Sequence, residues 1–117
     1  CDAVQGFLKV PFTPEGLGVD TLAVSGHKVH APKGIGALYI RRGLRLPPLI
    51  RGGGQEEGLR SGTEPTAQTA AFAAAVEAGR ASLERDLAHM RELKDYAART
   101  LREQVPGLEL IGCSGAH

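Results

Sequence analysis

The run Ser25-Gly26-His27-Lys28 is the part of this sequence best suited to chemistry. The stretch that starts at Thr21 and ends at Ser25 is rich in apolar and β-favouring residues and predicts a β-strand, after which Gly26 predicts a turn. A lysine held at a strand end beside a hydroxyl and an imidazole can form a Schiff base with an aldehyde. On the tetrapeptide alone, a polar corner without chemistry remains the alternative.

Four further blocks of residues accompany this tetrapeptide. Upstream lies Asp2-Ala3-Val4-Gln5, and downstream lie Pro32-Lys33-Gly34-Ile35-Gly36-Ala37-Leu38-Tyr39, Gly52-Gly53-Gly54-Gln55-Glu56 and Arg60-Ser61-Gly62-Thr63. In order and spacing, the five blocks closely resemble the cysteine desulfurases of the NifS/IscS type, which are pyridoxal-phosphate enzymes of the class V aminotransferase group. The resemblance runs from Asp2 into the helix after Thr63, and it favours the catalytic lysine over the polar corner.

The resemblance implies a role at pyridoxal 5'-phosphate for each matching residue. Lys28 carries the Schiff base and moves protons at the substrate carbon. Asp2 pairs with the pyridine nitrogen and Gln5 donates to the ring hydroxyl oxygen. Ser25 and His27 bind the phosphate of the same cofactor. Thr63 is implied to reach the phosphate of the neighbouring protomer's cofactor, which makes a homodimer part of the site.

Each of these roles has a structural alternative. Asp2 can cap a helix after a strand, and His27 can be a buried histidine with satisfied hydrogen bonds. Thr63 can cap the helix before Pro65, a role that is compatible with contacting a phosphate. The neighbouring motifs favour the cofactor roles for Asp2 and His27. Arg60 is expected to support its loop.

Neither cysteine is expected to be the nucleophile that a desulfurase needs. Cys113 lies in a turn that matches a variable loop of the family, and Cys1 is expected to be buried as a small apolar residue. The family's persulfide cysteine lies in a later segment that has no counterpart here. The two cysteines form no metal-ligand spacing and no dense disulfide framework, so no metal site is predicted. Ala31 stands where the family usually has glycine, which puts the tightness of that turn in doubt.

The predicted organisation is mixed α/β without internal repeats. Residues Phe7 to Leu17 predict a connecting loop with one short turn, and Val19 to Ser25 and Ile35 to Arg41 predict two strands. The proline and glycine content between Gly43 and Gly62 excludes long regular elements. The triplet Gly52-Gly53-Gly54 indicates backbone that passes close to a ligand or a partner subunit. It lacks the lysine and hydroxyl of a nucleotide-binding loop, so nucleotide binding is rejected.

A long helix is predicted from about Pro65 to Val105. It carries an apolar stripe expected to pack against the protein, formed by Leu83, Leu87, Met90, Leu93, Ala97 and Leu101. Gly79 favours a bend or a break, because glycine in a helix interior costs about 1 kcal/mol relative to alanine. Pro106-Gly107 is expected to end the helix, and Leu108 to Ile111 to form the first strand of another domain.

The chain is expected to be a middle segment of a longer protein. Its 117 residues can bury one small core. By resemblance, residues 1–105 belong to the pyridoxal-phosphate-binding large domain of a fold type I transferase, with strands and loops over 1–64 and helix over about 65–105. Residues 106–117 begin the small C-terminal domain. The isolated segment is expected to be inactive.

Charge and hydropathy restrict the partners. The chain carries 14 Lys plus Arg and 13 Asp plus Glu, which indicates neither a nucleic-acid-binding surface nor a membrane-surface patch. No window approaches the roughly 18 apolar residues of a membrane span, and nothing resembles a secretion signal. A cytoplasmic protein with a small-molecule partner is expected.

The activity implied by the resemblance is removal of sulfur from L-cysteine. L-alanine leaves, the sulfur stays as a persulfide on an enzyme cysteine outside this chain, and an acceptor such as an iron–sulfur scaffold protein receives it. Two alternatives remain open: a related class V aminotransferase or selenocysteine lyase, and a non-catalytic fragment that does not retain the cofactor. The Gly-Gly-Gly-Gln-Glu and Arg-Ser-Gly-Thr blocks favour the desulfurase over the aminotransferase.

Overall fold

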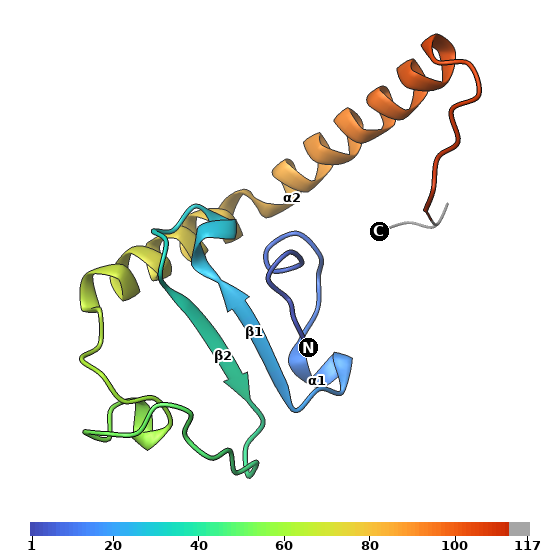
Figure 1. The fold of residues 1–117 in the computed structure, drawn as a ribbon. Helices are drawn as coiled ribbons and strands as arrows, with labels where there is room; N and C mark the ends of the chain where they lie inside the picture. Colours follow the sequence, from blue (N-terminus) through green and yellow to red (C-terminus); the bar gives the residue numbers. More distant parts are fainter. Residues whose placement is uncertain (113–117) are drawn as a thin grey trace.

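The computed structural model of the protein describes residues 1–112. Its elements, in order, are α1 (Pro14–Leu17), β1 (Thr21–Ser25), the 3-10 helix η1 (Gly26–Val29), β2 (Gly36–Ile40), the 3-10 helix η2 (Glu56–Gly58) and α2 (Thr66–Gln104). Figure 1 shows the two strands side by side, with α2 crossing behind one end of them. The architecture is α/β, as predicted.

Strand β1 is one of the two strands of the small sheet. It pairs with β2 in antiparallel register, from Thr21 opposite Ile40 to Ser25 opposite Gly36. On its other side the N-terminal segment runs parallel to it, with Asp2 beside Ala23 and hydrogen bonds of 2.9 and 3.0 Å that join Ala23 to residues 3 and 1. Both predicted strands are confirmed. Because the N-terminal segment and β1 are parallel, their carboxyl ends lie at the same edge of the sheet.

The core of the described chain is small and lies around β1 and η1. The buried residues are Ala3, Leu22, Gly26, Val29, Ala31 and Ser61. Cys1 is exposed, so its expected burial is wrong, because no described segment covers its side of the N-terminal strand. The loop before β1 contains one short helix, α1, as predicted. Within residues 1–112, no helix combines the length and the apolarity that crossing a membrane requires.

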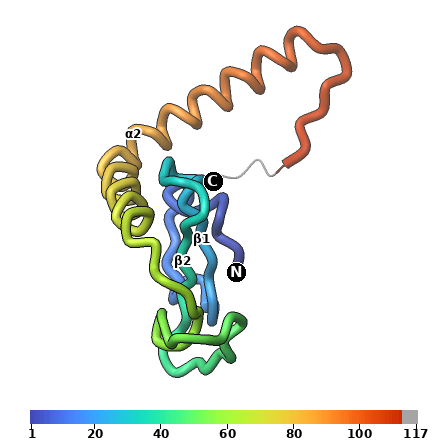
Figure 2. The backbone as a smooth tube through the Cα atoms, turned by 60° about the vertical axis from the view of Figure 1, so that its left-hand side comes forward, coloured from blue at the N-terminus to red at the C-terminus, as the bar shows by residue number. Residues whose placement is uncertain are grey.

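Helix α2 runs without interruption through Gly79. Of the two predicted outcomes, a bend or a break, the structure has the bend, which is visible near the middle of α2 in Figure 2. Gly79 faces Leu8 of the N-terminal loop, so its missing side chain serves close packing instead of ending the helix.

The second half of α2 extends beyond the sheet (Figure 2). The predicted apolar stripe is half-buried at Leu83 and Leu87, but Met90, Leu93 and Leu101 are exposed, between 43% and 52%. The expected packing therefore holds only near the sheet, since no described segment reaches the outer half.

The end of α2 agrees with the sequence, but the strand expected after it does not form. Helix α2 ends at Gln104, just before Pro106-Gly107. Residues 108–111 are irregular, because a strand needs a neighbour to complete its hydrogen bonds and no described segment lies beside them. Cys113 lies outside the described residues.

Candidate functional site

Lys28 lies in η1, directly after the end of β1, as the sequence predicted. The turn is closed by two backbone hydrogen bonds: Gly26 N–H donates to the Ile35 carbonyl at 2.9 Å, and Ala31 N–H donates to the Gly26 carbonyl at 3.0 Å. Val29 and Ala31 are buried, which fixes η1 to the core and leaves Lys28 half-buried. Alanine at position 31 therefore keeps the turn tight.

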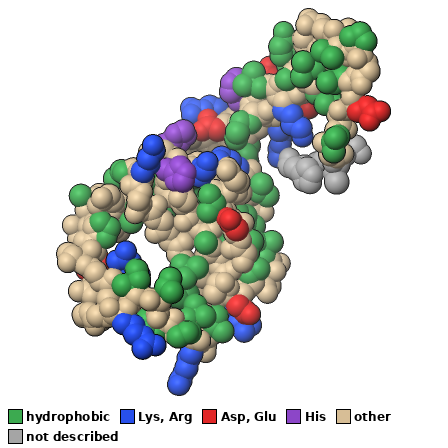
Figure 3. All heavy atoms as spheres, viewed as in Figure 1, with side chains coloured by type: hydrophobic (Ala, Val, Ile, Leu, Met, Phe, Trp, Pro, Cys, Tyr) green, Lys and Arg blue, Asp and Glu red, His purple; other side chains and the backbone are tan. Residues whose placement is uncertain are grey.

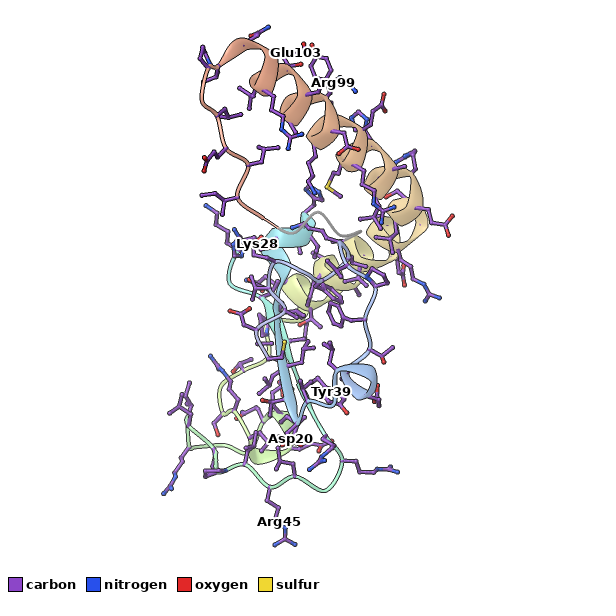
Figure 4. All side chains as sticks on the ribbon, turned by 90° about the vertical axis from the view of Figure 1, so that its right-hand side faces the viewer. Asp20, Lys28, Tyr39, Arg45, Arg99 and Glu103 are labelled. Atoms are coloured by element: carbon purple, nitrogen blue, oxygen red, sulfur yellow. The ribbon has the colours of Figure 1, made fainter. Side chains whose placement is uncertain are left out.

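Figure 4 shows Lys28 at the end of the sheet nearer the outer half of α2, far from Asp20 and Arg45 at the opposite end. This is the end at which β1 and the parallel N-terminal segment finish. In sheets with parallel strands, ligands commonly bind at the carboxyl edge. Lys28 is thus at the edge where a bound molecule is most readily placed.

Ser25 and His27 form a side-chain pair beside Lys28. The Ser25 Oγ lies 2.8 Å from the His27 Nδ1, and His27 is exposed, so the alternative of a buried histidine is wrong. If Ser25 donates to Nδ1, the imidazole keeps an N–H at Nε2; if Nδ1 donates, the hydroxyl proton of Ser25 is free. In either tautomer the pair retains one donor for an anion.

Asp2 lies on the N-terminal segment at the same edge. Its Oδ1 accepts a hydrogen bond of 2.9 Å from the Val4 N–H, so this oxygen caps a turn, whereas the helix that the capping alternative expected after Asp2 is not formed. Among residues 1–112 no hydrogen bond engages the other carboxylate oxygen, which stays open to a donor. Gln5 follows in the same turn and is exposed.

Thr63 lies in the segment that leads into α2, and the structure does not bring it to the lysine. In Figure 1 this segment runs on the far side of β2 from the N-terminal segment. Helix α2 begins after Pro65 without any side-chain cap, so the capping alternative for Thr63 is wrong. Thr63 is exposed, and within the described residues its hydroxyl forms no hydrogen bond.

The glycine-rich loop before Thr63 folds on itself. A Cβ at Gly52 would stand 3.1 Å from the Ser61 Cβ, and one at Gly53 would stand 3.0 Å from the Gln55 side-chain amide. The close neighbours of Gly52 and Gly53 in this structure belong to this chain, and the expectation that the triplet lies close to a ligand or a partner subunit stays a prediction. The Arg60 Nη1 donates to the Ser61 carbonyl at 2.9 Å, consistent with its expected support of the loop.

A second group of polar side chains, which the sequence did not connect with Lys28, lines a cavity of about 270 Å³ between η1 and α2. Lys9 comes from the N-terminal loop, Lys28 and His30 from η1 and its C-cap, and Asp86 and His89 from α2. Figure 3 shows histidine and basic side chains gathered on this part of the surface. The sequence could have predicted that these α2 residues lie together, because residues spaced by three and four positions share one helix face. The residues with this spacing are Gly79, Ser82, Asp86 and His89.

The pKa of Asp86 is lowered, first by the hydrogen bond from Ser82 and then by the one from Arg85. The Ser82 Oγ lies 2.6 Å from Oδ2, and the Arg85 Nε lies 3.1 Å from Oδ1. Both donors come from α2 itself. The carboxylate on this side of the cavity is therefore held ionised by its own helix.

Known proteins similar to this chain identify its family. The family model described as aminotransferase class-V matches residues 1–117. A cysteine desulfurase from Gluconacetobacter diazotrophicus is 46% identical over 111 residues, which cover 95% of this chain and 28% of that protein. The chain thus spans little more than a quarter of the length of the curated relatives it matches.

Solved structures similar to this chain also include a NifS-like protein. It superposes with a TM-score of 0.81 at 44% identity, covering 87% of this chain and 28% of the other. A structure titled SspA in complex with cysteine superposes with a TM-score of 0.62 at 51% identity, over 65% of this chain and 22% of the other. The chain belongs to the aminotransferase class-V family, in which it corresponds to a segment of the fold type I cysteine desulfurases of the NifS/IscS type.

Proposed function

We propose that this chain supplies the lysine-bearing part of the active site of a pyridoxal 5'-phosphate-dependent cysteine desulfurase. The observation that carries the proposal is the position of Lys28, Asp2 and the pair of Ser25 and His27 at one edge of the sheet. Relatives named cysteine desulfurase and the similar structure titled as a complex with cysteine support L-cysteine as the substrate.

The residues at this edge fit the chemistry of the cofactor. A half-buried primary amine, a free carboxylate oxygen and a hydroxyl–imidazole pair match an aldehyde, a pyridine nitrogen and a phosphate dianion, respectively. Hydrogen bonds to a charged phosphate are stronger than neutral ones, so the pair needs no surrounding positive patch. When bound, pyridoxal phosphate supplies an aldehyde for covalent attachment and a ring that withdraws electrons from the substrate's α-carbon.

Each side chain of this chain then has a defined task. Lys28 would hold the aldehyde of the cofactor through its Nζ, and the same amine would move protons at the substrate carbon. Asp2 holds the proton on the pyridine nitrogen through its free oxygen, and Gln5 donates to the ring hydroxyl. Ser25 and His27 anchor the phosphate, which fixes the ring relative to Lys28.

The remaining tasks belong to groups outside the described chain or in a second copy. We propose a cytoplasmic homodimer in which the exposed Thr63 hydroxyl donates to the phosphate in the neighbouring protomer. A cysteine outside this chain takes the sulfur and passes it to an acceptor such as an iron–sulfur scaffold protein, and L-alanine leaves. We also propose that residues 1–105 lie in the large domain and that residues 106–117 open the small one.

The test is covalent trapping in the complete protein. After incubation with pyridoxal phosphate and reduction with borohydride, peptide mass spectrometry is expected to find the label on Lys28. Lys33→Ala, a change at the nearest other lysine after η1, is the matched control and is expected to keep the label on Lys28. A label on another lysine in the wild-type protein, or an unchanged label in Lys28→Ala, contradicts the proposal.

A substrate comparison tests the second half of the proposal. The complete protein is expected to release alanine from L-cysteine and to form a persulfide. If Lys28 is labelled but no alanine is released from L-cysteine, the proposed cofactor site stands and the proposed desulfurase activity is wrong. The result would then favour a related class V enzyme.

A further inference from the structure

We infer that Gln55 is a positioning residue that presents Thr63 to the cofactor phosphate of the neighbouring protomer. Its side chain folds back over seven residues, and its Oε1 accepts a hydrogen bond of 3.0 Å from the Gly62 N–H. The inference rests on the proposed role of Thr63. It adds a residue to which the family resemblance gave no task.

The Gly62 N–H has no other acceptor among residues 1–112. Gly62 adopts a φ of +123°, a conformation that L residues with side chains rarely adopt. Because glycine can adopt many backbone conformations, contacts must fix the conformation of Gly62 and with it the direction of the chain into Thr63. The Gln55 amide supplies one at the N–H, and the Ser61 backbone supplies the other through a hydrogen bond of 3.1 Å from its N–H to the Ile50 carbonyl.

The loop is built to let the Gln55 side chain reach this position. Gly53 has no side chain to collide with the folded amide, which would stand 3.0 Å from a Cβ there. Gly52 gives the same freedom to Ser61, which is buried. On the other side of Gly62, Thr63 is exposed, and its hydroxyl forms no hydrogen bond within the described residues. The hydrogen bond between the Gly62 N–H and the Gln55 Oε1, here called the clamp, therefore holds the backbone at Gly62 and leaves the Thr63 hydroxyl free.

The first experiment measures the clamp without cofactor. In the complete protein, amide hydrogen exchange at Gly62 is expected to be faster in Gln55→Met, which keeps the side-chain length and removes the acceptor. Gln55→Glu keeps an acceptor at the same reach and is the matched control, expected to preserve slow exchange. Equal exchange at Gly62 in the wild type and Gln55→Met would overturn the inference.

The second experiment tests whether Gln55 acts through Thr63. Loss of one hydrogen bond predicts that Gln55→Met raises the dissociation constant of pyridoxal phosphate roughly 2- to 10-fold, measured by absorbance titration. In a Thr63→Val background, which lacks the hydroxyl, the same change is expected to have less than about a 1.5-fold effect, because coupled residues are not additive. Equal effects in the two backgrounds overturn the inference.

The outcomes separate this inference from the proposed function. Labelling of Lys28 together with equal effects of Gln55→Met in both backgrounds rejects only the positioning role. Labelling of Lys28 together with unchanged affinity in Thr63→Val rejects the role of Thr63 and the inference, and it leaves the cofactor site intact. Absence of label on Lys28 rejects the proposed function itself. The unfolding temperature and the size-exclusion volume of each variant show whether it is folded and dimeric.

Discussion

Leu8 packs against Gly79 in the middle of helix α2, so closely that a Cβ at Gly79 would stand 3.0 Å from the Leu8 Cδ1. Leu8 itself has a φ of +56°, a conformation that costs a non-glycine residue about 1–2 kcal/mol. A strained residue on one element and a glycine on another thus meet where the N-terminal loop crosses the helix.

This contact predicts that Gly79→Ala has an effect that depends on Leu8. In a helix interior alanine is favoured over glycine by about 1 kcal/mol, but in the wild-type background the new methyl group must displace Leu8. We expect Gly79→Ala to be near neutral in the wild type and to raise the unfolding temperature in a Leu8→Ala background. Differential scanning calorimetry of the complete protein measures both, and equal shifts in the two backgrounds would show that the contact does not limit the helix.

The hydroxyl–imidazole pair predicts a selective loss of cofactor affinity in Ser25→Ala. Without the hydroxyl, the phosphate loses one donor and the His27 imidazole loses the partner that orients it at 2.8 Å. Hydrogen bonds to charged groups contribute about 1.5–3 kcal/mol, so the dissociation constant is expected to rise roughly 10- to 100-fold. Thr21→Val, which removes a hydroxyl at the other end of β1, is the control, and a similar loss in that variant would contradict the pair's role.

The position of Gly62 predicts that Gly62→Ala damages the loop more than Gly58→Ala does. Both glycines have positive φ, +123° and +79°, so both alanines are strained by about 1–2 kcal/mol. Only the Cβ at Gly62 meets a neighbour, the Arg60 Nη1 at 2.5 Å, and Arg60 must then release the Ser61 carbonyl. Limited proteolysis is expected to cut the Gly62→Ala loop faster than the Gly58→Ala loop; the reverse order would be inconsistent with this packing.

The lowered pKa of Asp86 predicts that removal of its main hydrogen-bond donor, the Ser82 hydroxyl, changes the pH at which this carboxyl is protonated. In Ser82→Ala the hydrogen bond to Oδ2 is lost, so the pKa of Asp86 is expected to rise towards its ordinary value. Because the folded-state pKa is depressed, the stability from the ionised carboxylate is present above the ordinary pKa and is lost as pH falls through the folded value. Carboxyl ¹³C shifts of labelled Asp in both proteins measure the change, with Arg85→Gln as the smaller comparison, and an unchanged titration in Ser82→Ala rejects the assignment.

The local sequence predicted those elements whose hydrogen bonds and packing lie close along the chain. The strand from Thr21 to Ser25 and the turn that carries Lys28 are of this kind, since a short β-favouring run followed by glycine leaves few alternatives. The Ser25 and His27 contact follows from the same proximity, because the two side chains are two residues apart.

The failures share a physical cause, which is dependence on a distant part of the chain. Gly79 predicted a bend or a break from the local pattern alone, but its close contact is with Leu8, a residue far away in the sequence. The apolar run at 108–111 has the composition of a strand but no described neighbour to pair with. Asp86 and His89 reach the wall beside Lys28 only because α2 crosses the end of the sheet, and local patterns carry no information on that crossing.

Because α2 is continuous, its outer part would move as one rigid unit if the angle of its bend changed. From Gly79 to Gln104 the helix rises about 37 Å, at 1.5 Å per residue. A change of about 10° in the bend displaces the far end by roughly 6 Å, whereas the first half, held beside the sheet, barely moves. A small change in the bend angle near Ser82 and Leu8 would therefore produce a large displacement of the last turns of α2 and of the residues that follow them.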